Sequence, residues 1–180
     1  MATLKHRFLD HKINSETETL IIGTFNPETE GNDAEIFYGR SRNFLWRLLP
    51  TAFIEKDLKQ ADKLEKLAFI KRKKIDFIDL ILQIEVDNGQ EKNYLDSYID
   101  SRVIEWRDII LEIKNLKALK RVCFTRKTFS GIPSMQKRVE AVQEYCDKND
   151  IIFQAMTTPA RYYSEDKQTE WTNFLQNDNR

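Results

Sequence analysis

The chain has 180 residues, a hydrophobic fraction of 41% and 11 phenylalanines, which suits one globular domain over residues 1–180. Its 29 basic and 29 acidic residues cancel, so any surface that binds nucleic acid must be local. No apolar run approaches the roughly 18 residues that span a bilayer, and the first residues lack the apolar core of a signal peptide, so we expect a cytoplasmic protein with no membrane partner.

Strands and helices are predicted to alternate along the chain. Short apolar runs bounded by turn residues predict strands over residues 19–25, 75–81, 119–125 and 151–156. Helical spacing predicts helices over 43–50, 56–71, 101–116 and 134–148, and a last helix that follows a cap at Ser164. This order implies parallel crossovers, and hence a three-layer α/β/α sandwich around a four-stranded parallel sheet.

The end of the first predicted strand carries the strongest functional signal. The strand stops at Gly23 and leads through a polar loop to Tyr38 and Asn43, just before a helix. Ligands of open α/β sheets gather at the carboxyl ends of such strands. The pattern therefore predicts a pocket for a flat, polar group.

In this stretch the sequence resembles the uracil-DNA glycosylase superfamily, in particular its hypoxanthine-DNA and mismatch-specific branches. The family's strand, glycine and proline turn match residues 19–27, and its aromatic residue, small residue, asparagine and tryptophan match Tyr38, Gly39, Asn43 and Trp46, with Arg40-Ser41 in place of His-Pro. Residues 75–80 with 95–99, and 157–160 with 165–171, resemble later parts of the family pattern. Together these pieces cover most of the chain in the family's order.

The resemblance implies a monofunctional DNA glycosylase, which hydrolyses the bond between a damaged or deaminated base and its deoxyribose in base excision repair. The nucleotide must first be flipped out of the duplex. Such an enzyme needs no cofactor and no metal, its partner is DNA with a damaged or mispaired base, and we expect it to act as a monomer. The residues expected to bind the base are Gly23, Thr24, Phe25 and Tyr38, with Tyr38 as the stacking ring.

Two asparagines are candidates for the catalytic amide. The hypoxanthine branch uses an asparagine that matches Asn43, and the mismatch-specific branch uses one that lies near Asn26 and directly before a proline. We rank Asn43 first, because Asn26 lies one residue further from Gly23 than that branch requires. Both have simpler interpretations: Asn26-Pro27 as a turn, and Asn43 as a polar residue in the first turn of a helix.

Basic residues and threonines follow the predicted strands and are expected to bind DNA. The last loop, 157–162, resembles a segment that would push into the minor groove and fill the gap left by the flipped nucleotide. A capped loop that leads into a helix with a buried Trp171 is the simpler interpretation, as an exposed basic turn is for Arg126 and Lys127. The expected DNA-binding residues are Arg40, Arg42, Arg126, Lys127, Thr157, Thr158 and Arg161.

Other chemistries find little support in the sequence. Cys123 and Cys146 form no CxxC pair and are expected to be buried thiols. Two cysteines are too few to hold an iron–sulfur cluster. The five glycines form no P-loop and no GxGxxG motif.

No metal-binding pattern is formed by the two histidines of the chain or by the two aspartates of the second predicted strand. His6 and His11 lie in the N-terminal segment and are expected to be solvated or to cap local backbone. Asp76 and Asp79 are expected on opposite faces of their strand, which argues against a shared metal, and we expect Asp79 to be a structural acid. The alternative to an enzyme is a non-catalytic nucleic-acid-binding module that keeps the glycosylase fold.

Overall fold

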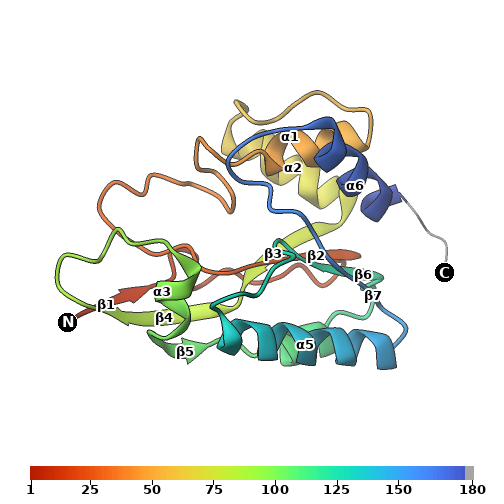
Figure 1. Ribbon diagram of the computed structural model, residues 1–180. Coiled ribbons are helices and arrows are strands. Elements are labelled where there is room, and N and C mark those ends of the chain that lie inside the picture. Colours follow the sequence, from red (N-terminus) through yellow and green to blue (C-terminus); the bar gives the residue numbers. More distant parts are fainter. Residues whose placement is uncertain (177–180) are drawn as a thin grey trace.

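Four parallel strands form the central sheet of the protein, whose computed structural model describes residues 1–176 (Figure 1). The last four residues of the single domain that we expect over 1–180 lie outside this range. The strands are β2 (Thr19–Gly23), β3 (Ile75–Asp79), β6 (Arg121–Phe124) and β7 (Ile152–Ala155), in the spatial order β3-β2-β6-β7. All three pairings are parallel, which confirms the predicted α/β class and its four-stranded parallel sheet.

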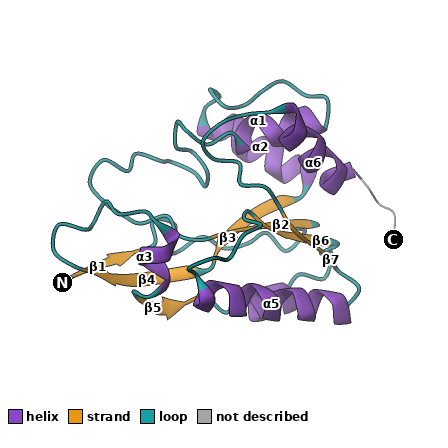
Figure 2. Ribbon diagram, viewed as in Figure 1, coloured by secondary structure: helices purple, strands orange, loops and turns teal. Residues whose placement is uncertain are grey.

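Helices cover both faces of this sheet (Figure 2). Along β2, Ile21 points to one face, whereas Leu20 and Ile22 point to the other, and all three are fully buried. A strand that is buried on both faces reads as a continuous apolar run, which is why β2 is predictable from sequence. The first face carries α1 (Leu45–Ala52), α2 (Lys63–Lys73) and α6 (Glu165–Gln176), and the second carries α4 (Ile109–Lys114) and α5 (Pro133–Lys148).

A second, antiparallel sheet was not predicted. It has the order β1-β4-β5 and consists of β1 (Ala2–Lys5), β4 (Ile81–Val86) and β5 (Val103–Trp106). Only Leu80 separates β3 from β4, so the chain passes directly from the parallel sheet into this one. The short helix α3 (Asp96–Asp100) lies between β4 and β5.

The predicted helix over 101–116 is wrong in its first half. Residues 103–106 pair with β4 as the edge strand β5, and the helix begins only after Asp108, whose side chain accepts a hydrogen bond from the Leu111 amide at 3.0 Å. The helix predicted over 56–71 also starts later, because Asp62 caps α2 through the Glu65 amide at 2.8 Å.

Several smaller expectations are confirmed. The Ser164 hydroxyl accepts a hydrogen bond from the Lys167 amide at 3.3 Å and so caps α6, and Trp171 is fully buried. Cys123 and Cys146 are buried free thiols. Within the part of the chain that the structure describes, no helix combines the length and apolarity needed to cross a membrane.

Ile54, in the loop after α1, provides a test of backbone strain. Its φ is 59° and the residue is 97% exposed, so a β-branched side chain adopts a left-handed conformation without any burial. That conformation costs about 1–2 kcal/mol in an L-residue, and glycine adopts it without this cost. Glycine also makes the unfolded chain more flexible, which offsets part of the gain in stability. We expect Ile54→Gly to raise the free energy of unfolding by about 1 kcal/mol in urea titrations. Ile54→Ala, which keeps the Cβ, should gain less than half of this, and a destabilised glycine variant would contradict the prediction.

Candidate active site

A cleft of about 850 Å³ opens at the carboxyl ends of the parallel strands. Because β2, β3, β6 and β7 run in the same direction, the segments that follow them meet at this edge. All thirteen site residues predicted from sequence line the cleft: Gly23, Thr24, Phe25, Asn26, Tyr38, Arg40, Arg42, Asn43, Arg126, Lys127, Thr157, Thr158 and Arg161.

Two segments that are far apart in the sequence are joined at the cleft wall. Asn43 and Ala160 form an isolated antiparallel bridge. Beside it, the Phe44 amide donates to the Pro159 carbonyl at 2.9 Å and the Arg161 amide donates to the Arg42 carbonyl at 2.8 Å. Residues 38–46, which we call the first motif, and the last loop therefore form one ladder, which places Asn43 next to the 157–162 loop.

Asn43 presents a hydrogen-bond donor to the cleft. Its Oδ1 accepts a hydrogen bond from the Leu45 amide at 2.9 Å, at the start of α1. Its Nδ2 has no hydrogen-bond partner among residues 1–176. The helix-start interpretation of Asn43 therefore holds for the oxygen, and the amide nitrogen stays free to donate to a ligand.

Asn26 is held more tightly inside the protein. Its Oδ1 accepts hydrogen bonds from Asn32 Nδ2 at 2.8 Å and from the Arg40 guanidinium at 3.1 Å. Its backbone carbonyl accepts the Arg7 amide at 2.8 Å. Asn26 therefore anchors the loop and orients Arg40. Both lone pairs of its side-chain oxygen, Oδ1, are occupied, so this atom cannot accept a hydrogen bond from a ligand.

Tyr38 lies in the wall of the cleft with its hydroxyl directed toward β2, β3 and β6. Its φ is 58°, and its ring centroid lies 5.5 Å from that of Phe77. The hydroxyl lies 3.4 Å from Thr125 Oγ1. Burial and the nearby Asp79 carboxylate raise the pKa of Tyr38 well above 10, so the phenol is neutral in the physiological range.

His6 is buried against Asp79, contrary to the expectation of a solvated or capping histidine. The residue is only 3% exposed, and its Nε2 lies 2.7 Å from Asp79 Oδ2. The backbone amide of Phe8 donates to His6 Nδ1 at 3.0 Å, so the ring proton must be on Nε2 and is donated to Asp79. Sequence reasoning missed this contact because 73 residues separate its partners and no local spacing marks it.

A second aspartate–histidine contact, between Asp76 and His11, lies on the other face of β3. His11 Nε2 lies 2.8 Å from Asp76 Oδ1, and the Asn14 amide donates to Oδ2 at 2.9 Å. Unlike Asp79, Asp76 does not line the cleft. The opposite-face placement of the two aspartates agrees with the expectation from sequence.

Gly23 allows Asp79 and Tyr38 to approach β2. A Cβ at this position would lie 2.2 Å from Asp79 Oδ1 and 2.7 Å from the Tyr38 hydroxyl. Both distances are far below van der Waals contact. The absence of a side chain at Gly23 is therefore what lets a carboxylate and a phenol converge at the floor of the cleft.

The basic residues of the cleft differ in their partners. Arg126 forms an ion pair with Asp96, and Lys127 lies 3.0 Å from Glu170. Among residues 1–176, Arg40, Arg42 and Arg161 form no ion pair, although Arg40 is bonded to Asn26 and stacked on Tyr94. The local positive charge available to an anionic ligand therefore comes from Arg40 and from the two arginines beside the ladder.

Two side chains of α6 clamp the 157–162 loop. Glu170 accepts the Thr157 amide at 2.9 Å and the Thr157 hydroxyl at 2.6 Å. Near the end of the loop, the buried Lys167 ammonium donates to the carbonyls of Ala160 at 3.1 Å and Tyr162 at 2.9 Å. The loop is thus pre-organised from the helix beneath it.

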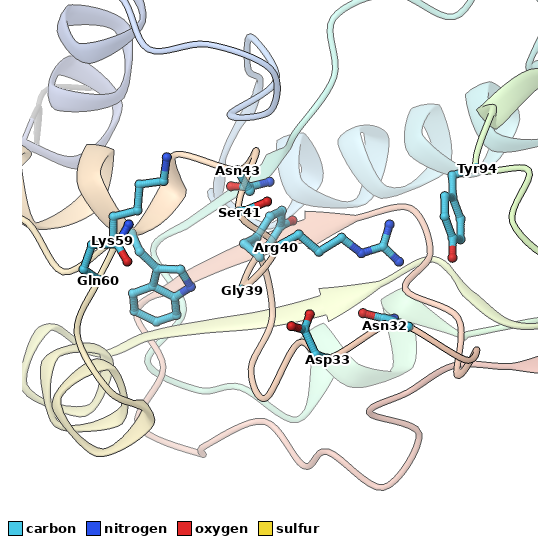
Figure 3. Close-up of a pocket in the computed structure, with 12 residues that line it drawn as sticks. Asn32, Asp33, Gly39, Arg40, Ser41, Asn43, Lys59, Gln60 and Tyr94 are labelled. Atoms are coloured by element: carbon cyan, nitrogen blue, oxygen red, sulfur yellow. The ribbon is translucent and has the colours of Figure 1, made fainter.

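A smaller pocket of about 430 Å³ lies beside the cleft and shares the 38–43 segment with it (Figure 3). Arg40 extends toward Tyr94 here, with its guanidinium carbon 4.4 Å from the ring centroid. This stacking, together with the hydrogen bond to Asn26, fixes Arg40 at the junction of the two pockets.

The same fold occurs in a solved structure. The solution NMR structure of a "putative Uracil DNA glycosylase" from Methanosarcina acetivorans aligns with a TM-score of 0.63, over 91% of this chain and 92% of that chain. The two chains share a fold. Their sequence identity is 19%, so the likeness bears on the fold alone. No family model and no curated protein matches this sequence.

The Glu170 clamp predicts a pH dependence of stability. Burial raises the pKa of Glu170, but the bonds from Thr157 and Lys127 outweigh this and hold it below the ordinary 4.5. A lowered carboxyl pKa contributes stability above pH 4.5 that is lost as the pH falls through the folded-state value. We expect Glu170→Gln to lower the free energy of unfolding by about 1–2 kcal/mol at pH 7, and the difference to vanish in acid.

Urea titrations at several pH values measure this difference. The control is Glu144→Gln, which removes an exposed carboxylate paired with Lys148 on the surface of α5 and should change stability little. A Glu170 effect that stays constant down to the lowest pH would show that the charge is not what clamps the loop.

Proposed function

We propose that this protein is a monofunctional DNA glycosylase that removes a flipped-out uracil or hypoxanthine. The observation that supports this most strongly is the convergence, in one cleft, of an aromatic ring, an unpartnered amide donor and unpaired arginines, provided by Tyr38, Asn43, Arg42 and Arg161. The fold shared with the Methanosarcina acetivorans protein adds support.

The cleft has the properties that a flipped nucleotide requires. Unstacking a base costs a few kcal/mol, and contact with an aromatic ring returns about 1–3 kcal/mol per base. Tyr38 offers that ring, and the cleft of about 850 Å³ has room for a nucleotide. Arg42 and Arg161 lie on the ladder at its wall, where the phosphates on either side of an extruded nucleotide would pass.

In the proposed reaction, Asn43 stabilises the departing base. Negative charge accumulates on the base carbonyl oxygens as the glycosidic bond breaks, and a positioned N–H donor lowers the energy of that state. Asn43 Nδ2 is such a donor, because the Leu45 amide bond to Oδ1 fixes the orientation of the side chain. Uracil and hypoxanthine both carry a carbonyl oxygen that this amide suits. The reaction is a hydrolysis and takes no cofactor, and we propose that the protein acts as a monomer.

A non-catalytic DNA-binding module is the second candidate. It is favoured by the internal engagement of Asn26 Oδ1 and of the Thr157 hydroxyl, which leaves fewer groups for chemistry than the motif resemblance implies. Such a module would bind DNA with the same arginines and excise nothing. Incubation with labelled duplexes that carry each lesion, followed by cleavage at abasic sites, separates the two candidates.

Asn43→Asp tests the proposed donor. The aspartate keeps an oxygen for the Leu45 amide but has no N–H to offer the base, whereas Asn43→Ala loses both. Loss of one transition-state donor should lower single-turnover excision by about 10²-fold or more in either variant, and DNA affinity should stay nearly unchanged in the uncharged Asn43→Ala. Only the alanine variant should also lose stability. Excision by Asn43→Asp at the wild-type rate would assign the chemistry to another residue.

Salt titrations test the arginines. Each phosphate neutralised on duplex DNA adds about −0.9 to the slope of log affinity against log salt. Arg161→Ala should reduce that slope by about 0.9, whereas Arg126→Ala should change it less, because Asp96 already neutralises Arg126. If the 157–162 loop fills the gap left by a flipped nucleotide, Arg161→Ala should weaken binding to a lesion duplex more than to an intact one. Equal losses on both duplexes would leave the loop without that role.

A further inference from the structure

The proposed hydrolysis needs an acceptor for a proton of the attacking water, and the asparagines do not provide it. Asn26 Oδ1 already accepts two hydrogen bonds. Asn43 Oδ1 accepts the Leu45 amide, and the group that Asn43 leaves free is a donor. The acceptor must therefore come from another side chain of the cleft.

Among residues 1–176, two carboxylates line the cleft, and they differ in that only Asp96 is neutralised by an arginine. Asp96 forms an ion pair with Arg126. Asp79 receives the His6 proton on Oδ2, and its Oδ1 has no hydrogen-bond partner among residues 1–176. Asp79 is 6% exposed and lies at the end of β3, on the floor of the cleft. Its Oδ1 is thus an unpartnered acceptor in a nearly buried position.

His6 holds this carboxylate in one orientation. The Phe8 amide occupies Nδ1, so Nε2 carries the proton and donates it to Asp79 Oδ2 at 2.7 Å. The imidazole itself packs among aromatic rings, with centroids 5.7 Å from Phe37 and 5.9 Å from Phe25. A ring fixed at both nitrogens leaves Asp79 no freedom to turn Oδ1 away from the cleft.

A second acceptor lies beside Asp79 Oδ1. The Thr125 hydroxyl donates to the Ile22 carbonyl at 3.3 Å, so the Tyr38 hydroxyl donates its own proton to Thr125 Oγ1. A lone pair of the Tyr38 oxygen then remains free to accept. Both Asp79 Oδ1 and this oxygen crowd the position where Gly23 lacks a Cβ, at 2.2 Å and 2.7 Å from it.

We propose that Asp79 Oδ1 and the Tyr38 hydroxyl bind the nucleophilic water beside Gly23, with Asp79 as the catalytic base and His6 as its positioning residue. This inference rests on the proposed glycosylase function. A water that donates both protons to these two oxygens has its lone pairs directed away from them, toward the cleft. Asp79 thus has a chemical role in place of the structural one expected from sequence.

The step balances as a hydrolysis. The water oxygen bonds to C1′ of the deoxyribose while the bond from C1′ to the base nitrogen breaks, and the bonding electron pair leaves with the base. One water proton passes to Asp79 Oδ1 and is then released to the base anion. The products are the free base and an abasic sugar with a hydroxyl on C1′.

Single-turnover excision of the lesion duplex that the wild type processes tests the assignment. Asp79→Asn should lower the rate by about 10²- to 10⁴-fold, the usual contribution of a general base, while the Kd for the same duplex changes less than twofold. Asp76→Asn is the matched control, because it removes a buried carboxylate that is bonded to a histidine on the same strand but lies outside the cleft. It should keep excision within threefold of wild type.

The positioning role of His6 and the water site have separate readouts. His6→Gln keeps an N–H donor and should retain most of the rate, whereas His6→Phe keeps a ring and should lose at least tenfold without loss of DNA affinity. Gly23→Ala should abolish excision, because its Cβ would displace Asp79 Oδ1 and the Tyr38 hydroxyl from the positions that hold the water. Added formate should restore part of the activity of Asp79→Ala, which a purely structural role for Asp79 would not allow.

The outcomes separate this inference from the proposed function. A wild type that excises no base from any lesion duplex overturns the glycosylase function, and this inference with it. A wild type that excises, together with an Asp79→Asn variant within twofold of its rate, overturns the role of Asp79 alone. Equal losses in Asp79→Asn and Asp76→Asn, without formate rescue, would make both aspartates structural and would also overturn it.

Discussion

The pairing of β2 with two parallel neighbours is the constraint on which the site depends. Gly23 lies opposite Asp79 on β3, and Ile22 lies opposite Phe124, the residue before Thr125, on β6. This register brings a glycine, a carboxylate and a hydroxyl to the same level at one edge of the sheet. Because β2 is hydrogen-bonded to a strand on each side, a slip of its register would break two ladders at once, and the site is as fixed as the core itself.

The ladder between the 42–44 and 159–161 segments fixes two loops relative to the parallel sheet. Its backbone hydrogen bonds join the first motif to the segment after β7, and α6 supports that segment through Glu170 and Lys167. A donor such as Asn43 Nδ2 is effective only if its orientation is set before the ligand arrives. Here that orientation depends on contacts among three chain segments that are distant in sequence.

The parallel sheet was predictable because its strands are short, apolar and separated by helices, so that local pattern and tertiary environment agree. The antiparallel sheet was not. Its edge strand β5 has four residues, of which Ile104 is 55% exposed, and its apolar and charged residues extend the pattern of α4 as well as they fit a strand. Pairing with β4 decided the outcome, and such pairing has no local signature.

The candidate site was predictable in its membership and not in its internal partners. Residues placed after strand ends by sequence all line the cleft, since topology alone brings strand ends together. The contacts of Arg126 with Asp96 and of His6 with Asp79 join distant segments, and they change what each residue can do. Acidic partners neutralise Arg126 and Lys127, so the unpaired positive charge of the cleft lies on Arg40, Arg42 and Arg161. In the function that we propose, weak general attraction to DNA makes recognition depend on the shape and hydrogen bonds of the extruded base.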